Sequence, residues 1–327
     1  MVHTEETQAR LAAIPNLTVL PGAPLSRYTR FAIGGPADLY AETSSAEAFI
    51  AALHIARESG ESYVVIGGGT NLIVSDEGFR GIVLRFTARR MLAAGDRVVA
   101  DSGAVLQDLV DFTVDRGLKG LETLAGIPGS VGAAVYGNAG AYGHSISERV
   151  HSVRFYDGRD VRVADRDACE FQYRESVFKR HKDWIIFSTE LVMENADAAE
   201  LRKISGDIVN VRNEKFPVTM KCAGSIFKNL LLADLSDSVA AVVPARVIRE
   251  GKVPAAYFLE EVGAKGMTRG DIHVATYHAN LIYNGGAGTA VDLRAVIDEL
   301  KARVQEKFLL TLEEEVQYVG FPDTARA

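Results

Sequence analysis

Two glycine-rich stretches limit the folding of this chain more than any other feature of its sequence. The first, Gly-Gly-Gly-Thr-Asn at 67–71, directly follows residues 63–66, whose Tyr-Val-Val-Ile sequence predicts a buried strand. The second, 126–143, consists mostly of glycine, alanine and other small residues. Glycine weakens regular elements and offers no side chain to pack, so such stretches are typical of places where a ligand or another backbone comes close. A tight turn and a close helix–strand contact are the alternatives without a ligand.

The first stretch matches neither of the common nucleotide-binding motifs. A Walker A loop would continue with Gly-Lys-Ser/Thr, and none follows here. In the Rossmann fingerprint counted from Gly67, the third glycine would fall on position 72, which is Leu72. The loop is nevertheless suited to phosphate, because glycine lets the backbone approach an anion closely and donate its N–H groups.

Hydrophobic periodicity predicts helices and strands mixed along the whole chain. The predicted strands are 63–66, 82–86, the two arms of a hairpin within 150–163, and 312–319. One predicted helix begins at a capping-box pattern of Ser44 and Glu47. Three further helices are predicted at 105–116, around 201–211 and at 290–308. On the last helix, the face expected to point inward carries Leu293, Val296, Ile297, Leu300 and Val304. A composition shift at 213–219, which includes the helix-ending Pro217, predicts a domain boundary.

Length and composition are those of a folded protein with more than one domain. The 327 residues are too many for one ordinary core and suggest two or three domains. The apolar fraction of 47% and the charged fraction of 24% are typical of globular proteins. The net charge of −7 argues against non-specific nucleic-acid binding, so an anionic ligand would need a local basic patch.

The sequence gives no indication of export, membrane insertion or metal binding. Residues 1–15 lack the apolar core of a signal peptide, and no apolar run approaches the roughly 20 residues that span a bilayer. The two cysteines, Cys169 and Cys222, have no metal-ligand spacing, and neither do the seven histidines, of which His278 is expected to be structural. We therefore expect a cytoplasmic protein with reduced thiols, no disulfide and no metal site.

Three short polar motifs are candidates for chemistry, and each has a plain structural alternative. Tyr-Arg-Glu-Ser at 173–176 lies in an irregular stretch, where its arginine could pair with a carboxylate through two hydrogen bonds or could simply be solvated. Ser225 lacks the Gly-x-Ser-x-Gly elbow of hydrolases, and a turn serine is the alternative. Glu-Glu-Glu at 313–315 places Glu313 and Glu315 on one strand face, with a solvated edge as the alternative.

Seven motifs follow one another along the chain. They are Phe-Ala-Ile-Gly-Gly-Pro at 31–36, Ile-Gly-Gly-Gly-Thr-Asn-Leu at 66–72, the stretch 125–143, Tyr-Arg-Glu-Ser at 173–176, Gly-Ser-Ile-Phe-Lys-Asn at 224–229, His-Ala-Asn at 278–280 and Leu-Glu-Glu-Glu-Val at 312–316. In this order and spacing they resemble the UDP-N-acetylenolpyruvoylglucosamine reductase (MurB) family, over about residues 25–320. Each motif is weak alone, whereas the ordered set is specific.

The resemblance implies an α+β fold with three parts. In this family a vanillyl-alcohol-oxidase-like FAD-binding region of two subdomains, here expected at 1–92 and 93–213, precedes an α+β substrate-binding domain, here expected at 214–327. The implied activity is the conversion of UDP-N-acetylenolpyruvoylglucosamine to UDP-N-acetylmuramate in peptidoglycan precursor synthesis, with FAD as cofactor and NADPH as hydride donor. The implied partner is the UDP-sugar substrate, without nucleic acid or membrane insertion, and a monomer is favoured.

The resemblance also assigns residues to roles. The family's catalytic arginine, serine and glutamate fall on Arg174, Ser225 and Glu315. The expected FAD-binding positions are Ile66, Gly67, Gly68, Gly69, Thr70, Asn71, Leu72, Gly126, Ser130, Gly132, Asn138, Gly140 and Ala141. The positions that match substrate contacts, including contacts to its phosphates, are Tyr142, Tyr173, Arg212, Lys215 and Asn229.

These residue types suit the implied reaction. Hydride added to C3 of an enolpyruvyl ether leaves negative charge at C2 that spreads into the adjacent carboxylate, and Arg174 could stabilise that charge. Ser225 would deliver a proton to C2. Glu315 would hold a proton on the carboxylate side or orient Arg174, and we expect it in a partly desolvated setting.

Several positions depart from the family's pattern. Arg30 stands where a second threonine is common, Leu230 where proline is common, and Gln317 where a basic residue commonly follows the glutamate, which weakens one anionic contact. Only 51 positions separate the catalytic arginine from the serine, which is typical of a short form that lacks an inserted loop with a substrate-covering tyrosine. The segment 230–262 is long for that form, and the sequence assigns it no role.

Three other functions remain open on the sequence alone. A flavin oxidase of the same fold would lack the arginine, serine and glutamate in this order. A catalytically inactive protein that keeps the nucleotide-sugar site would not need all three positions filled. A Rossmann-fold dehydrogenase is disfavoured by Leu72.

Overall fold

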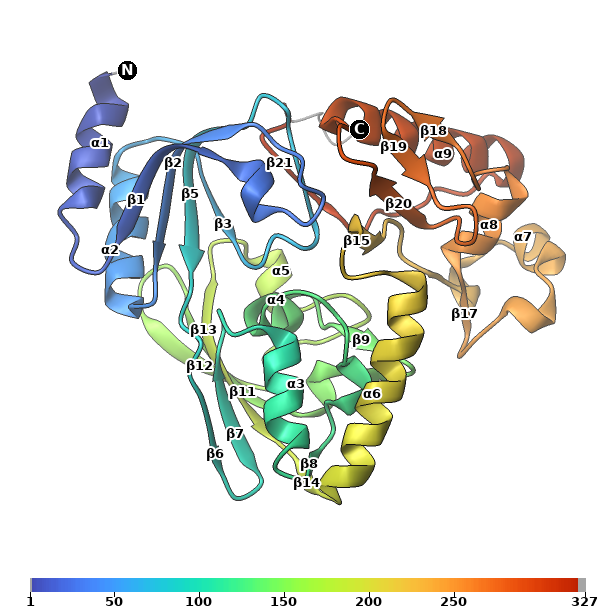
Figure 1. The fold of residues 1–327 in the computed structure, drawn as a ribbon, viewed down its shortest axis with the longest axis horizontal. Helices are drawn as coiled ribbons and strands as arrows, with labels where there is room; N and C mark the ends of the chain where they lie inside the picture. The colour runs from blue at the N-terminus through green and yellow to red at the C-terminus, as the bar shows by residue number, and fades with distance from the viewer. Residues whose placement is uncertain (1, 323–327) are drawn as a thin grey trace. The chain divides into compact units, whose positions relative to one another are not determined.

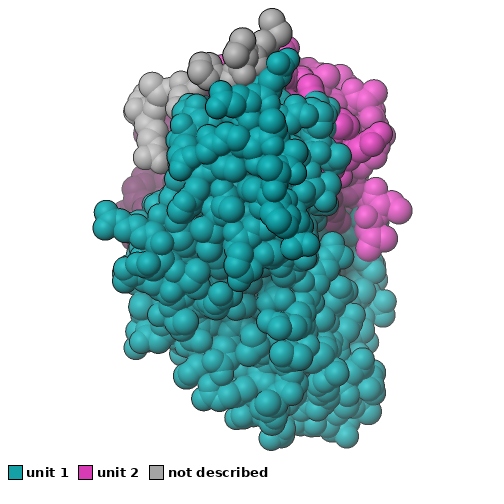
Figure 2. Space-filling model, turned by 90° about the vertical axis from the view of Figure 1, so that its left-hand side faces the viewer, with its two compact units in different colours: residues 1–23, 37–69, 80–217 teal, residues 24–36, 70–79, 218–327 magenta. Residues whose placement is uncertain are grey.

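The computed structural model of the chain describes residues 2–322, in which helices and strands are mixed throughout (Figure 1). Contacts between residues divide the chain into two compact units, each built from three segments (Figure 2). The first unit consists of Met1–Ala23, Ala37–Gly69 and Arg80–Pro217, and the second of Pro24–Pro36, Thr70–Phe79 and Val218–Ala327. Two short segments from the N-terminal third of the chain therefore group with its C-terminal part. The division into parts 1–92, 93–213 and 214–327 stays a prediction.

A four-stranded sheet forms one core of the first unit. Its strand order is β1 (Thr18–Pro24), β2 (Pro36–Thr43), β5 (Phe79–Phe86) and β3 (Tyr63–Ile66). β3 and β5 pair in parallel, so the predicted strands at 63–66 and 82–86 are confirmed. Helices α1 (Val2–Ala12) and α2 (Ala46–Glu58) contact each other, and α2 buries Phe49 and Leu53 in this core.

The predicted start of α2 was wrong by one residue. Ser45, not Ser44, caps the helix, because its Oγ accepts a hydrogen bond of 3.1 Å from the backbone N–H of Ala48. The carboxylate of Glu47 accepts from the same Ser45 hydroxyl at 2.8 Å instead of closing a box with Ser44.

A five-stranded antiparallel sheet forms the other core of the first unit. Its strand order is β12 (Val161–Asp165), β11 (Val150–Tyr156), β13 (Ile185–Val192), β7 (Arg97–Asp101) and β6 (Met91–Ala94). The predicted hairpin is confirmed as β11 and β12, whose turn is closed by a 3.0 Å bond from Asp157 N to Asp160 O. Two short pairs complete the strands: β8 (Leu118–Lys119) with β14 (Glu194–Asn195), and β9 (Gly140–Ala141) with β10 (His144–Ser145).

Four helices accompany the five-stranded sheet. They are α3 (Leu106–Val114), α4 (Val131–Tyr136), α5 (Val177–Arg180) and α6 (Ala198–Lys215). The predicted helices at 105–116 and around 201–211 are confirmed as α3 and α6, and α6 ends just before Pro217. The apolar faces of these helices and of the sheet share one buried cluster that includes Leu109, Val135 and Val153.

The second unit is built around a smaller antiparallel sheet. Its strand order is β15 (Lys221–Ser225), β20 (Leu281–Asn284), β19 (Ile272–Val274) and β18 (Thr268–Arg269). The remaining strands pair as β16 (Leu230–Leu231) with β17 (Lys252–Val253), and β4 (Leu72–Val74) with β21 (Gln317–Val319). The helices are α7 (Asp237–Val242), α8 (Ala255–Glu261) and α9 (Ala290–Phe308). Short 3₁₀ turns occur in both units, at Leu25–Tyr28, Glu122–Leu124, Ile146–Glu148, Leu232–Asp234 and Ala245–Val247.

Helix α9 confirms the prediction for 290–308 at both ends. All five residues expected to face inward are at most 1% exposed. The first turn is capped twice: the hydroxyl of Thr289 accepts from the N–H of Asp292 at 3.1 Å, and the carboxylate of Asp76 accepts from Ala290 and Val291 at 2.9 and 3.0 Å. The second unit therefore fixes α9 against the segment that also carries β4.

The predicted strand at 312–319 was only partly right. A regular ladder exists at Gln317–Val319, where β21 runs parallel to β4. Residues 313–315 form an isolated antiparallel bridge instead, with Phe227 opposite Glu314. The chain bends at Val316 and changes partner within a few residues, so one continuous strand does not form.

Within residues 2–322, no helix is both long and apolar enough to span a membrane. Nor do any three His, Cys, Asp or Glu residues in this range gather where they could hold a metal ion. Cys169 and Cys222 are both buried free thiols, and burial raises the pKa of Cys169 to about 12.

Candidate functional site

In the first unit the two glycine-rich stretches lie against each other. A side chain on Gly67 would place its Cβ 3.0 Å from the Oγ of Ser130, and one on Gly68 would lie 3.3 Å from the Cα of Gly129. Ser130 caps α4 through a 3.3 Å bond from the N–H of Ala133. The structure thus brings together residues about 60 positions apart whose backbones approach so closely because neither glycine carries a side chain.

The backbone in this region fits a phosphorylated ligand. Strand β3 ends at Ile66 and leads into the exposed Gly67. The segment opposite Gly67 is the start of helix α4, which Ser130 caps, so its first backbone N–H groups are those of a helix N-terminus. Backbone N–H groups of this kind, without side chains in front of them, are what a pyrophosphate requires. The residues present therefore fit the pyrophosphate of FAD.

A second junction joins the glycine-rich stretch to the Tyr-Arg-Glu-Ser motif. Three side chains bridge segments 136–140 and 172–176: Asn138 Nδ2 donates to Gln172 O at 2.8 Å, Arg174 Nη2 to Gly140 O at 2.9 Å, and Ser176 Oγ to Tyr136 O at 2.7 Å. Asn138 and Ser176 are buried. The two motifs, separate in the sequence, form one hydrogen-bonded body in the first unit.

The backbone of Arg174 adopts a conformation that is rare for a residue with a side chain. Its φ is +58°, and Tyr142 and Asn138 have φ values of +54° and +42°. Lys179 holds this loop, because its Nζ donates to Arg174 O at 2.9 Å and pairs with the carboxylate of Glu175 at 2.7 Å. Strain of this kind in non-glycine residues gathers at functional sites. The role of Lys179 was not predicted from the sequence, where its only signal is its place one helical turn after Glu175.

Arg212 and Lys215 supply cations on α6. A Cβ at Gly126, which has a φ of +74°, would lie 3.0 Å from Arg212 Cδ, so the arginine crosses directly over this glycine. Gly126 N donates to Gln107 Oε1 at 2.6 Å. Lys215 is exposed one turn further along the same helix. Gly132 is similarly confined, because a Cβ there would lie 2.6 Å from Ser102 Cβ.

In the second unit the structure brings Ser225 and Glu315 together through their neighbours. The N–H of Glu315 donates to the carbonyl of Ile226, the residue after Ser225, at 2.7 Å. Lys228 N donates to Glu313 O at 2.9 Å. Ser225 and Glu315, 90 positions apart in the sequence, therefore flank one antiparallel contact, and both are half-buried.

Asn71, the last residue of the first glycine-rich stretch, belongs to the second unit and supports this contact. Its Nδ2 donates to Glu315 O at 2.8 Å, and its own carbonyl accepts from Gln317 N at 3.0 Å. Leu72 then begins β4 opposite Gln317. The asparagine predicted to bind FAD thus also holds the backbone of the predicted catalytic glutamate.

The three consecutive glutamates are not a uniformly solvated edge. Glu313 pairs with Lys228 and has a side chain that is 71% exposed. Glu314 is only 15% exposed and pairs with Lys301 at 2.7 Å. Burial, together with a hydrogen bond to Glu314, raises the pKa of Tyr318.

Asn229 is placed apart from the Ser225 contact. Its Oδ1 accepts a 3.3 Å bond from Ala255 N at the start of α8, and the residue is exposed. It therefore fixes the far end of segment 230–254 within the second unit.

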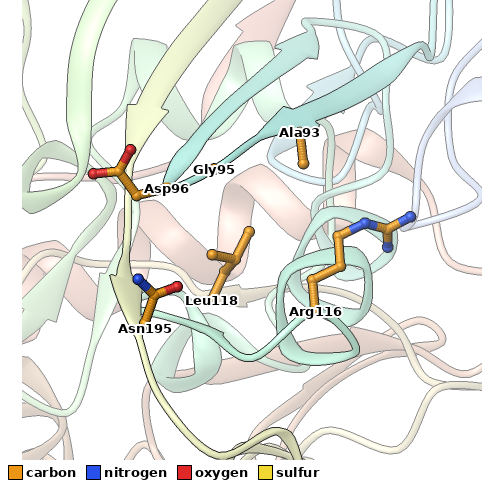
Figure 3. A pocket seen from close by; sticks show the side chains of 6 residues that line it. All are labelled: Ala93, Gly95, Asp96, Arg116, Leu118 and Asn195. Carbon is orange, nitrogen blue, oxygen red and sulfur yellow. The ribbon is translucent and has the colours of Figure 1, made fainter.

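An open pocket in the first unit contains none of the motif residues (Figure 3). Its lining consists of Ala93, Gly95, Asp96, Arg116, Leu118 and Asn195. The side chains of Asp96 and Arg116 point in different directions, and the Arg116 guanidinium lies 3.6 Å from the ring of Phe112. The pocket thus has no converging set of polar groups and is not a candidate site.

Comparisons with known proteins agree with this arrangement. A family model described as "FAD binding domain" matches residues 37–163, and one described as "UDP-N-acetylenolpyruvoylglucosamine reductase, C-terminal domain" matches residues 216–319. The UDP-N-acetylenolpyruvoylglucosamine reductase of Solibacter usitatus is 68% identical over 311 residues, which are 95% of this chain and 100% of that protein. The chain belongs to the UDP-N-acetylenolpyruvoylglucosamine reductase family.

More distant members of this reductase family give the same result. The enzyme of Rubrobacter xylanophilus is 36% identical over 91% of this chain and 94% of its own. The crystal structure of the reductase from Thermus caldophilus superimposes with a TM-score of 0.71 at 27% identity, covering 93% of this chain and 98% of that one. The predicted resemblance and the α+β fold with an FAD-binding region are confirmed.

The close approach at Gly68 leads to a prediction about the cofactor. Gly68→Val places methyl groups against Gly129 and Ser130, at the backbone expected to meet the pyrophosphate, so the purified variant should lose most of its FAD. Absorbance of the flavin relative to that of the protein measures the loss.

Gly206→Val is the matched control, because a Cβ at this exposed position of α6 meets nothing within 4 Å. It should keep its FAD. A Gly68→Val protein that retains one FAD per chain would contradict the assignment of this loop.

Proposed function

We propose that this chain is the NADPH-dependent reductase that converts UDP-N-acetylenolpyruvoylglucosamine to UDP-N-acetylmuramate for peptidoglycan precursor synthesis. The support is full-length similarity to relatives that carry the reductase name, together with the contact that holds Ser225 beside the Glu315 segment. The full-length similarity is the observation that carries the proposal, and all three candidate catalytic positions, Arg174, Ser225 and Glu315, are filled, which a binding protein without activity would not need.

FAD would be held by the glycine-rich stretches. Gly67, Gly68 and Ser130 would present backbone to its pyrophosphate, and the remaining predicted FAD positions in 126–141 would line the rest of its site. When bound, FAD would supply the redox chemistry, the carriage of hydride from NADPH to the enolpyruvyl double bond.

Arg174 would stabilise the charge that develops after hydride reaches C3. That charge spreads from C2 into the substrate carboxylate, and a guanidinium can meet a carboxylate with two parallel hydrogen bonds. Its bond to Gly140 O and the support from Lys179 would fix the guanidinium in advance. Such preorganisation costs no rearrangement when the charge appears.

Ser225 would deliver the proton to C2, which completes reduction of the double bond. Its hydroxyl lies at the end of β15, directly after Gly224, whose φ of +77° turns the chain out of the regular ladder. Glu315 would hold a proton on the carboxylate side, and its half-buried position suits that role. Arg174 belongs to the first unit, and Ser225 and Glu315 to the second.

The remaining assignments follow from the nature of the substrate. Arg212 and Lys215 would contact its phosphates and supply the local positive charge that a protein of net charge −7 needs for an anionic ligand. Tyr142, Tyr173 and Asn229 would contact other parts of it. Because NADPH and UDP-sugars are cytoplasmic metabolites, we place the enzyme in the cytoplasm, and we favour a monomer.

Arg174→Lys tests the two-point contact. A lysine keeps the charge but cannot form the paired hydrogen bonds, so transition-state stabilisation should fall by about 2–4 kcal/mol. Steady-state kcat/KM with the enolpyruvyl substrate measures this loss. The exposed Arg166→Lys is the control and should behave as wild type, whereas near-normal turnover of Arg174→Lys would refute the role.

Ser225→Ala separates proton donation from binding. The flavin absorbance should bleach normally with NADPH and then recover about 10²–10⁴-fold more slowly when substrate is added without oxygen, the usual range for lost general acid catalysis. Stopped-flow spectroscopy measures both half-reactions, and Ser225→Cys should retain more activity because a thiol still donates a proton.

A turn serine gives a different pattern. Both half-reactions would change little, and the free energy of unfolding would fall by about 1 kcal/mol through one lost hydrogen bond. Recovery of the flavin absorbance at the wild-type rate in Ser225→Ala would show that another group donates the proton.

A further inference from the structure

The backbone that follows Ser225 leaves the regular ladder of its sheet. Ser225 lies opposite Leu281 of β20, but the register is irregular between Cys222 and Ser225. The N–H groups of Ile226 and Phe227 are buried, since both residues are at most 1% exposed, and buried N–H groups require partners. The main-chain carbonyl of Asn280 accepts from Ile226 N at 3.1 Å, and the main-chain pairing ends there, so a further group must satisfy Phe227 N.

Asn280 supplies the acceptor for Phe227 N, and a second acceptor for Ile226 N, with its side chain. Its Oδ1 accepts from Ile226 N at 3.1 Å and from Phe227 N at 2.9 Å, while its Nδ2 donates to Phe227 O at 2.9 Å. A carboxamide that accepts from and donates to the same residue reproduces the two-point pairing of neighbouring antiparallel strands. Asn280 is 2% exposed and immediately precedes β20, so the strand fixes its position.

The opposite side of the same backbone carries Glu315. The carbonyl of Ile226 accepts from Glu315 N at 2.7 Å, so the Ile226–Phe227 backbone lies between Asn280 on one side and the glutamate segment on the other. Any shift of this backbone moves Ser225, which is covalently attached, relative to Glu315. The role of Asn280 is therefore geometric, because its polar atoms face backbone.

We infer that Asn280 is a positioning residue for the proton-donating step: it sets the place of Ser225 through the Ile226–Phe227 backbone. The inference rests on the proposed function of Ser225. Sequence analysis included Asn280 in the His-Ala-Asn motif at 278–280 without a role. His278 supports it, since its Nδ1 accepts from Asn280 N at 3.2 Å.

Asn284 offers a matched control at the other end of the same strand. It is 4% exposed, its Oδ1 accepts from Gly286 N and Gly288 N at 2.8 Å each, and its Nδ2 donates to Phe31 O at 2.9 Å. Asn280 and Asn284 thus bury the same group and make the same kinds of hydrogen bond. The difference is that Asn284 holds a loop without catalytic candidates.

The experiment compares Asn280→Ala with Asn284→Ala in the holoenzyme, by stopped-flow measurement of both half-reactions. In Asn280→Ala, recovery of the flavin absorbance with the enolpyruvyl substrate should slow by about 10–100-fold, the cost of a small misplacement of a catalytic group. Bleaching by NADPH should stay within about twofold of wild type. Asn284→Ala should lose comparable thermal stability but keep both rates within about threefold.

A double variant tests whether Asn280 acts through Ser225. Ser225→Ala/Asn280→Ala should be no slower than Ser225→Ala alone, because a positioning residue has nothing to position once the hydroxyl is gone. Multiplied losses in the double variant would overturn the inference, as would a wild-type substrate rate in Asn280→Ala or an equal loss in Asn284→Ala.

Hydrogen exchange separates this inference from the proposed function. The amide of Phe227 should lose protection in Asn280→Ala, whereas Ile226 keeps the main-chain carbonyl of residue 280 as acceptor, and β15 and β20 should keep their protection. A wild-type enzyme whose reduced flavin is not reoxidised by the substrate would refute the proposed function. Unchanged protection of the Phe227 amide in Asn280→Ala would refute the inference that the Asn280 side chain holds the backbone.

A second variant, Asn280→Asp, serves if the alanine variant does not fold, because aspartate keeps the shape and the acceptor oxygen. It should also slow the substrate half-reaction, and a wild-type rate would contradict the inference.

Discussion

The antiparallel contact between 226–228 and 313–315 is the interaction on which the proposed chemistry depends. Its hydrogen bonds from Glu315 N to Ile226 O and from Lys228 N to Glu313 O set the relation between the serine and the glutamate. Neither segment is part of a long strand, so the contact relies on support from outside. Asn280 holds one side of it, and Asn71 holds the carbonyl of Glu315 from the other.

In the first unit the corresponding constraint is that Gly67 and Gly68 carry no side chains, which lets their backbone lie close to the start of α4. Gly67 and Gly68 approach the start of α4 so closely that a Cβ would meet Ser130 or Gly129. The same stretch continues to Gly140, whose carbonyl accepts from Arg174. The backbone proposed to bind the cofactor and the candidate catalytic arginine are therefore joined by hydrogen bonds, and these bonds hold Arg174 at its strained φ of +58°.

The sequence predicted elements well wherever one face is buried along a regular period. Helix α9 and the hairpin of β11 and β12 were predicted at or near their observed ends, because periodicity and turn residues are local signals. The strand at 312–319 was only partly right, because its partner changes from Phe227 to β4, a choice set by residues distant in the sequence. The hydrogen bonds from the Asn280 side chain to the backbone of Ile226 and Phe227 could not be predicted either, since such an asparagine looks in sequence like any loop asparagine.

We conclude that this chain is a flavin-dependent reductase, and we propose that its substrate is an enolpyruvyl nucleotide-sugar. The most direct test is the visible spectrum of the purified wild-type protein without oxygen, recorded alone, after NADPH and after UDP-N-acetylenolpyruvoylglucosamine. The account predicts about one FAD per chain, bleaching of the flavin bands by NADPH, and their full return when the substrate is added. A colourless protein that cannot be reconstituted with FAD, or a reduced flavin that the substrate leaves unchanged, would contradict it.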